Sequence, residues 1–151
     1  MKSSNHKIAE NVRLNLLKLT HVAKSSHLGS SLSIVEILTI LYNDFLIKKK
    51  RDRFFLSKGH GCLALYCVLY EKKIVSKKTL LSYGQNNSIL MNHASHHVPG
   101  VIFSTGSLGH GLPVCVGSAL SSKIKKKNEK AYVLISDGEL NEGTTWESLL
   151  F

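Results

Sequence analysis

Residues 131–147, AYVLISDGELNEGTTWE, combine a continuous apolar run, an acidic turn and the start of a helical pattern. The run AYVLIS is typical of a parallel strand that is buried on both faces. Four of the chain's ten carboxylates fall in the short segment from Asp137 to Glu147 that follows this run. Because ligands of parallel α/β sheets lie at the carboxyl ends of strands, this acidic turn is the first candidate site.

Outside this stretch, the sequence predicts helices that alternate with short strands. Apolar residues recur at helical spacing or form apolar segments bounded by glycine and polar residues. The predicted helices are 7–24, 33–46, 62–73, 76–84 and 113–123, and the predicted strands besides 131–136 are 53–57 and 101–104. We expect Ser33 and Glu36 to form a capping box at the start of the second helix. The alternation predicts an α/β fold with a parallel sheet and helices on both faces.

The composition is that of a basic, single-domain protein. The 151 residues include 20 Lys and Arg against 10 Asp and Glu, which gives a formal net charge of +10. Such a charge favours anionic partners such as phosphorylated molecules, an acidic membrane surface or nucleic acid, although a solvated lysine-rich surface is the simpler interpretation. Three cysteines without a paired spacing and an N-terminus without an apolar signal segment predict a reduced, cytoplasmic protein.

Three turns combine glycine with polar residues at predicted strand ends, namely Ser57–Gly61, Thr105–Gly111 and Ser136–Gly143. Glycine permits close backbone approach, and a helix that begins after the turn favours an anion. The order G-x-x-G-x-G over 106–111 differs from the dinucleotide fingerprint G-x-G-x-x-G. Together the three turns predict a site for a cofactor that carries phosphate.

The acidic turn has two interpretations. Carboxylates stabilise a helix N-terminus, which accounts for Glu139 and for a capping box of Thr144 and Glu147. Asp137 directly follows the strand and precedes Gly138, where a carboxylate is well placed to hold Mg²⁺ against a phosphate. We therefore expect phosphate on the glycine turns and the metal on Asp137.

Four stretches resemble the N-terminal, thiamine diphosphate-binding part of transketolases, and most closely the short N-terminal subunit of split transketolases. They are SSHLGSSLSIVEILTILY (25–42), RDRFFLSKGHGCLALY (51–66), PGVIFSTGSLGHGLPVCVGSAL (99–120) and VLISDGELNEGTTWE (133–147). The resemblance covers residues 25–151 in family order. It implies a thiamine diphosphate-binding α/β fold, here a partial diphosphate-binding domain over residues 1–151.

The resemblance also implies roles for single residues. Asp137 and Gly138 match the family's magnesium–diphosphate motif, with Asp137 as the metal ligand and Glu139 as a further cofactor-binding residue beside it. His60 matches a histidine near the diphosphate and the reacting centre, and His27 is similar to a histidine that faces the substrate. The remaining matches are His93 as a further active-site histidine, in a register that also admits His96 or His97, the thiamine contacts Gly106, Ser107 and Leu108, and Glu142 near the dimer interface.

Several positions depart from the family pattern. Ser136 stands where glycine is usual, Leu28 where proline is usual, and His110 where glutamine is common. The family's second magnesium ligand is an asparagine after the next helix, beyond Phe151. We therefore expect the chain to be incomplete and inactive alone, and to leave the apolar side chains Trp146, Leu149, Leu150 and Phe151 uncovered.

The resemblance implies that the complete enzyme uses the carbanion of thiamine diphosphate to cleave a ketose and passes a two-carbon unit to an aldose. The implied partners are the C-terminal transketolase half or subunit, in a homodimer or heterotetramer, and sugar phosphates as substrates, with neither nucleic acid nor a membrane. The alternatives are another thiamine diphosphate enzyme, such as a deoxyxylulose phosphate synthase or a 2-oxoacid dehydrogenase component, or a basic nucleic-acid-binding module. A zinc site at His93, His96 and His97 is disfavoured because no cysteine pair lies nearby.

Overall fold

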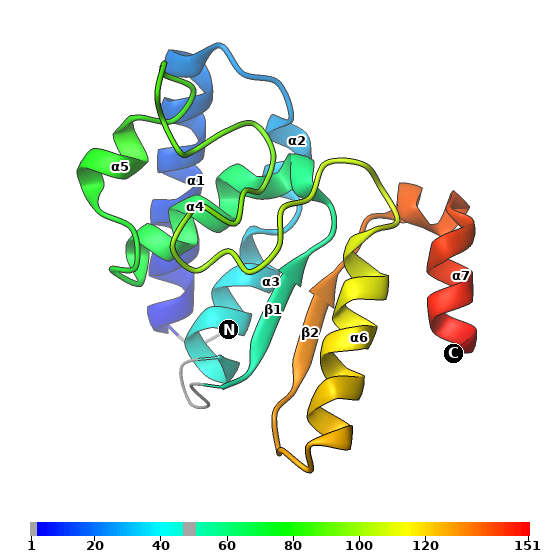
Figure 1. Ribbon diagram of the computed structural model, residues 1–151. Coiled ribbons are helices and arrows are strands. Elements are labelled where there is room, and N and C mark those ends of the chain that lie inside the picture. Colours follow the sequence, from blue (N-terminus) through cyan, green and yellow to red (C-terminus); the bar gives the residue numbers. More distant parts are fainter. Residues whose placement is uncertain (1–2, 47–50) are drawn as a thin grey trace.

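Two parallel strands form the centre of the protein in the computed structural model, which describes residues 3–46 and 51–151. Strand β1 (Arg53–Leu56) pairs with β2 (Ala131–Leu134), from Arg53 opposite Ala131 to Leu56 opposite Leu134 (Figure 1). The predicted parallel α/β arrangement is thus confirmed. The predicted strand over 101–104 is wrong, because this segment runs as a loop and the sheet of the described residues has two strands.

Helices account for most of the remaining structure. The α-helices are α1 (Ser3–Ala23), α2 (Leu28–Leu32), α3 (Val35–Ile40), α4 (Cys62–Glu71), α5 (Lys77–Leu81), α6 (Gly111–Ile124) and α7 (Gly143–Leu150). Two short 3₁₀-helices, η2 (Gly59–Gly61) and η3 (Asp137–Asn141), follow the two strands, and a π-helical segment, η1 (Leu41–Phe45), follows α3. Among the described helices, none combines the length and the apolar character that crossing a bilayer requires.

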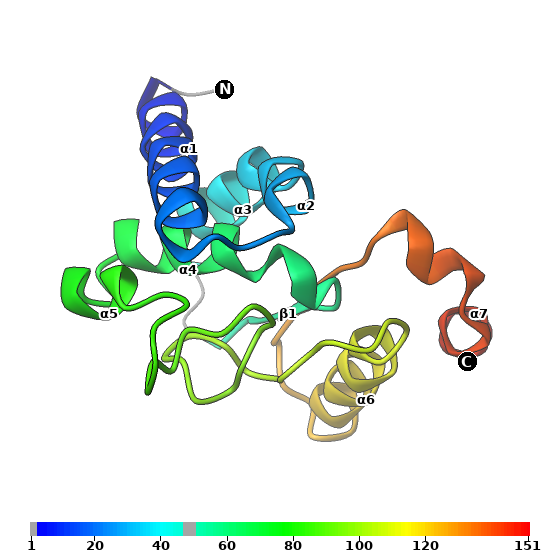
Figure 2. The same cartoon turned by 90° about the horizontal axis from the view of Figure 1, so that it is seen from above.

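Helices cover both faces of the strand pair, as the sequence predicts. Figure 2 shows α1, α3 and α4 on one side of the strands and α6 on the other. Phe54 and Leu56 point into the core with the first group, whereas the Arg53 guanidinium donates to Ser118 Oγ of α6 at 2.7 Å. This alternation follows from the two-residue period of a strand.

The core is built around α4, whose sequence CLALYCVL is apolar on every face. All eight of these residues, Cys62 to Leu69, are buried, which is expected for a helix without a polar side. Cys62, Cys67 and Cys115 are all buried, so the prediction that they are core residues is confirmed.

The predicted capping box of Ser33 and Glu36 is wrong. The helix predicted over 33–46 is interrupted, since α2 ends at Leu32 and α3 begins after Ile34 without a side-chain cap. The Ser33 hydroxyl donates to Ser30 O, and Glu36 forms an ion pair with Arg13 of α1. Ser33 is therefore bonded to the preceding turn, and Glu36 to a helix that is distant in the sequence, so neither side chain caps α3.

Strand β2 and helix α6 also differ in detail from the prediction. All four residues of β2 are half-buried rather than buried on both faces, because β1 is its one neighbour in the described sheet. Helix α6 begins at Gly111, so Pro113 is its third residue and not its first.

Candidate active site

The three glycine turns predicted from the sequence lie together. Because Leu56 and Leu134 are register partners, the turns that follow β1 and β2 begin side by side. The third turn joins them through Thr105, whose hydroxyl donates to Leu56 O at 2.7 Å. A Cβ at Gly59 would lie 2.5 Å from Thr105 O, so only glycine allows this approach. The turn over 105–111 follows a loop and not a strand, so side-chain contacts rather than the sheet position it.

A fully buried carboxylate crosslinks these turns. Glu139 has 0% exposure and accepts hydrogen bonds from Gly109 N at 3.0 Å and Ser136 N at 2.8 Å. The Ser57 and Ser136 hydroxyls also donate to it. Ser136 and Glu139 form a capping box at the start of η3. The N-cap of α7 is Glu142 and makes no side-chain cap bond, so the prediction of a capping box at Thr144 and Glu147 is wrong. The Thr144 hydroxyl instead donates to Gly109 O.

Three of the predicted catalytic residues form a histidine cluster, defined as His27, His60 and His93. The ring centroid of His27 lies 5.7 Å from that of His60 and 5.6 Å from that of His93. His27 has a left-handed backbone (φ 63°), a conformation that non-glycine residues adopt rarely and often at functional sites. His93 is the histidine of this loop whose ring contacts His27, whereas the rings of His96 and His97 lie against each other with centroids 4.1 Å apart.

The environment of His60 favours its neutral form. Partial burial lowers the pKa of His60, and the nearby Lys58, His27 and His93 lower it further, while Glu139 opposes them. A neutral imidazole can donate a hydrogen bond from one nitrogen and accept one at the other. His60 is therefore equipped to hold polar groups and to move protons near neutral pH.

Lys58 was not identified from the sequence. It is buried with 8% exposure, and its ammonium donates to Ser33 Oγ at 3.3 Å. Lysine is seldom buried. The charge of Lys58 disfavours protonation of the nearby His60 and contributes to the lowered pKa of that histidine. The signal available in the sequence was the position of Lys58 in the turn Ser57–Gly61, between a predicted strand and a glycine.

The predicted thiamine residues lie in the turn over 105–111, and the predicted metal residue lies in the turn over 136–143. Gly106 and Ser107 are exposed, and a Cβ at Gly106 would lie 3.7 Å from His93 Cδ2. Leu108 borders Gly138, where a Cβ would lie 3.7 Å from Leu108 Cδ1. The carboxylate of Asp137 is exposed, and it has no hydrogen-bond partner in the part of the chain that the structure describes.

Glu142 lies apart from the histidine cluster in its contacts. It is exposed, precedes α7 as its N-cap residue, and borders Gly109. The structure thus places Glu142 and Asp137 on the turn after β2. The histidine cluster instead combines His27 from the turn after α1, His60 from the turn after β1 and His93 from the loop over 82–104. Within residues 3–46 and 51–151, no group of three His, Cys, Asp or Glu side chains is arranged to hold a metal ion.

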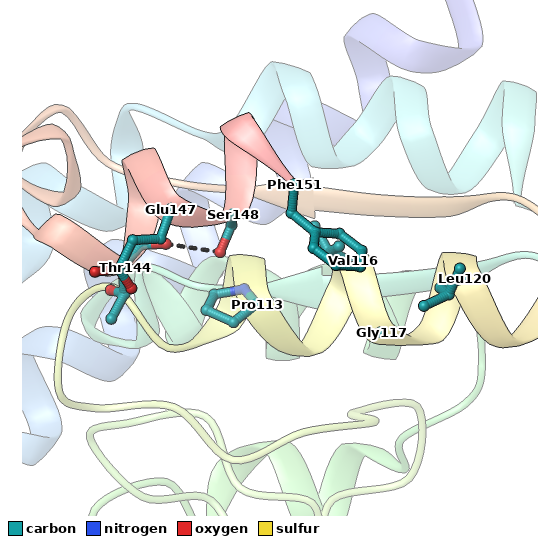
Figure 3. Close-up of a pocket in the computed structure, with 8 residues that line it drawn as sticks. All are labelled: Pro113, Val116, Gly117, Leu120, Thr144, Glu147, Ser148 and Phe151. Carbon is teal, nitrogen blue, oxygen red and sulfur yellow. Dashed lines mark hydrogen bonds between the residues drawn. The ribbon is translucent and has the colours of Figure 1, made fainter.

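A separate apolar groove of about 360 Å³ lies between α6 and α7. Figure 3 shows side chains from both helices around it, and no predicted site residue lines it. Its lining residues are Pro113, Val116, Gly117, Leu120, Thr144, Glu147, Ser148 and Phe151. This surface was not identified from the sequence, because it depends on how the two helices pack.

Comparison with known proteins gives consistent matches over nearly the whole chain. Residues 4–150 match the family described as transketolase, thiamine diphosphate binding domain. The chain is 40% identical over 149 residues to one of the subunits of the apulose-4-phosphate transketolase of Phocaeicola vulgatus, covering 94% of this chain and 53% of that protein. It is 46% identical over 132 residues to the protein of the same name from Actinobacillus succinogenes, covering 82% and 48%.

Solved structures give the same result. The transketolase of Campylobacter jejuni superposes with a TM-score of 0.86 at 28% identity, over 98% of this chain and 26% of that one. The chain spans about half the length of the curated relatives described above.

Proposed function

Because this chain belongs to the family of transketolase thiamine diphosphate-binding domains, we propose that it binds thiamine diphosphate and Mg²⁺ as part of a transketolase that transfers a two-carbon ketol unit between sugars. The observation that carries the proposal is the meeting of three glycine turns beside the histidine cluster. The turn after β2 brings the Asp137–Gly138 pair to the same place as Leu108.

The residues present fit the cofactor and its metal. Asp137 offers an exposed carboxylate without a partner among the described residues, and Mg²⁺ prefers oxygen ligands that it shares with phosphate. Gly106 is exposed and Gly138 is half-buried, and a Cβ at either position would meet no atom closer than 3.7 Å. Asp137 would hold the metal, Gly138 and His60 would contact the diphosphate, and Gly106, Ser107 and Leu108 would contact the thiamine.

The histidine cluster would act on the substrate side of the site. Thiamine diphosphate, when bound, supplies a nucleophilic carbon for attack on a ketose carbonyl. The imidazole side chains of His27, His60 and His93 would orient sugar hydroxyls and exchange protons with them. Glu142, exposed at the start of α7, would link this site to a neighbouring protomer.

Two relatives indicate the substrates and the assembly. Both are named as one of the subunits of an apulose-4-phosphate transketolase, so their name refers to a sugar phosphate and to a multi-chain enzyme, and both are similar over most of this chain. We extend both features to this protein: sugar phosphates as substrates and a C-terminal transketolase half as partner, in a homodimer or heterotetramer of the cytoplasm.

The test is the variant Asp137→Ala in the chain assembled with its C-terminal transketolase half. Calorimetric titration with thiamine diphosphate should give Mg²⁺-dependent binding in the wild type. Loss of an outer-shell partner of a bound metal costs roughly ten- to a hundredfold in affinity, and the variant should lose at least this much because it removes a metal ligand itself. Glu147→Ala, which removes another exposed carboxylate of the same region, is the control and should bind normally. Unchanged affinity in Asp137→Ala would move the metal site elsewhere.

A further inference from the structure

The carboxylate of Glu139 is the meeting point of the three turns, and each turn provides at least one donor to it. Oxygen Oε1 accepts from Gly109 N at 3.0 Å and from the Ser57 hydroxyl. Oxygen Oε2 accepts from Ser136 N at 2.8 Å and from Ser136 Oγ at 3.3 Å. Ser57 Oγ also accepts from Gly111 N at 3.1 Å, which extends the network to the first residue of α6.

This arrangement is one that a buried carboxylate needs. Removing a carboxylate from water is costly unless hydrogen bonds replace those lost, and the four donors to Glu139 meet that condition. The neighbouring backbone is fixed as well, since the Thr145 hydroxyl donates to Glu139 O at 2.6 Å. The side chain therefore specifies the positions of three segments that are far apart in the sequence.

We propose that Glu139 is a positioning residue of the cofactor site, whose buried carboxylate sets the spacing of the three turns without touching the cofactor. The proposal rests on the proposed function. Two donors lie next to residues assigned to cofactor binding: Gly109 follows Leu108, and Ser136 precedes Asp137. Losing the carboxylate would shift these two binding segments relative to each other and lower the affinity for thiamine diphosphate.

The substitution Glu139→Gln separates this role from simple packing. It preserves volume, but the amide presents an NH₂ group where one carboxylate oxygen was. In either orientation of the amide, that NH₂ meets a backbone N–H, of Gly109 or of Ser136, because both oxygens now accept from such a group. One of the two turns therefore loses its anchor even though the side chain still fits.

A matched control is available at the opposite end of β2. Glu129 is also a nearly buried carboxylate, with 6% side-chain exposure, and it accepts from Arg53 Nη2 at 2.9 Å and Ser122 Oγ at 3.3 Å. The variant Glu129→Gln should lower thermal stability and leave cofactor affinity unchanged. It thus measures what the loss of a buried carboxylate does outside the site.

Two measurements test the proposal. Hydrogen–deuterium exchange of the chain without cofactor should show faster exchange at the Gly109 or Ser136 amide in Glu139→Gln, and unchanged exchange there in Glu129→Gln. In the enzyme assembled with its C-terminal half, Glu139→Gln should raise the Kd and the KM for thiamine diphosphate about tenfold. A buried backbone amide that loses its acceptor costs a free energy equivalent to about a tenfold change in an equilibrium constant. The kcat at saturating cofactor should stay within about threefold of wild type, a pattern that loss of folded protein would not produce.

The outcomes separate the two proposals. If wild-type enzyme binds thiamine diphosphate and Glu139→Gln binds it equally well, the positioning role is wrong and the proposed function stands. If wild-type enzyme does not bind it, the proposed function fails and this inference fails with it. If Glu139→Gln does not fold, Ser57→Ala takes its place, because it removes one donor to Glu139 and the acceptor of Gly111 N. An unchanged Kd in a folded Ser57→Ala would then overturn the inference.

Discussion

His60 lies where several groups disfavour a positive charge. Lys58 is buried beside it, His27 and His93 share its cluster, and Glu139 opposes them by favouring protonation. Partial burial is the largest cause of the lowered pKa of His60. At neutral pH this side chain is therefore uncharged, which suits a residue that contacts a polar ligand and exchanges protons with it.

This lowered pKa predicts a pH dependence of stability. Below the ordinary value of 6.5, the unfolded chain takes up a proton at His60 more readily than the folded protein does. Stability should therefore decrease as the pH falls from about 6.5, and the decrease should be shallower in His60→Gln. Melting temperatures between about pH 5 and pH 7 measure it. The control variant is His21→Gln, at an exposed histidine. Equal slopes of melting temperature against pH for wild type and His60→Gln would contradict the expectation.

Single residues of the site were predictable where a local pattern carried them. Asp137 and Gly138 were predicted because they directly follow an apolar run, and His60 because the motif SKGHG resembles the transketolase family. The role of Glu139 was not predictable, since its bond to Ser57 spans 82 residues and a local pattern indicates only a helix N-terminus. Lys58 was missed for the same reason, because its ammonium donates to Ser33 Oγ, 25 positions away in the sequence.

At the scale of elements, the turn before α6 depends on one glycine. Gly109 has φ 80°, a left-handed conformation, and a Cβ there would lie 2.6 Å from Thr144 Oγ1. Gly117 is different: it lies inside α6, and a Cβ there would meet nothing within 4 Å. The two positions test the turn and the helix separately.

We expect opposite effects from replacing these glycines by alanine. Gly117→Ala should stabilise the protein by about 0.5–1 kcal/mol, because alanine loses less backbone freedom in a helix. Gly109→Ala should destabilise it by about 1–3 kcal/mol, because both the conformation and the contact with Thr144 oppose a Cβ. Chemical denaturation of both variants measures the difference. A Gly109→Ala protein as stable as wild type would show that the turn can rearrange.

Elements were predictable where composition and period agreed. The buried helix α4 and the amphipathic helix α1 were predicted from apolar residues at helical spacing. The loop over 101–104 was predicted as a strand because VIFS is apolar and β-prone, yet its backbone bonds to its own loop, with Val101 N donating to Val98 O. The predicted start of the helix over 76–84 is confirmed, since the Ser76 hydroxyl accepts from Thr79 N as the N-cap of α5, although α5 ends at Leu81.

At the scale of the whole molecule, α7 and the adjoining Phe151 expose several large apolar side chains to solvent. Trp146 is 53% exposed, Leu150 87% and Phe151 82%, next to the groove between α6 and α7. This confirms the prediction that these side chains are uncovered. Each contributes about 1.5–3 kcal/mol when fully buried, so a surface of this kind favours association.

We therefore expect the isolated chain to self-associate. Light scattering coupled to size-exclusion chromatography should give a mass above that of the monomer. The variant Leu150→Glu should reduce association, whereas Leu81→Glu, at an exposed leucine of α5, should not. A monodisperse wild-type monomer with a cooperative melt would show that the chain is self-sufficient, despite its apolar surface.

The pairing of β1 with β2 has a consequence for the order of folding. Partner residues lie 78 positions apart (131 − 53), so about half the chain must be gathered before the strands can pair. Contacts of such long sequence separation form late, whereas α1, α3 and α4 can pack from the first half alone. When refolding is followed by pulsed hydrogen exchange, the backbone amides of the three glycine turns should thus be the last to become protected from exchange. A nascent or partly folded chain would then possess a core long before it possesses a site.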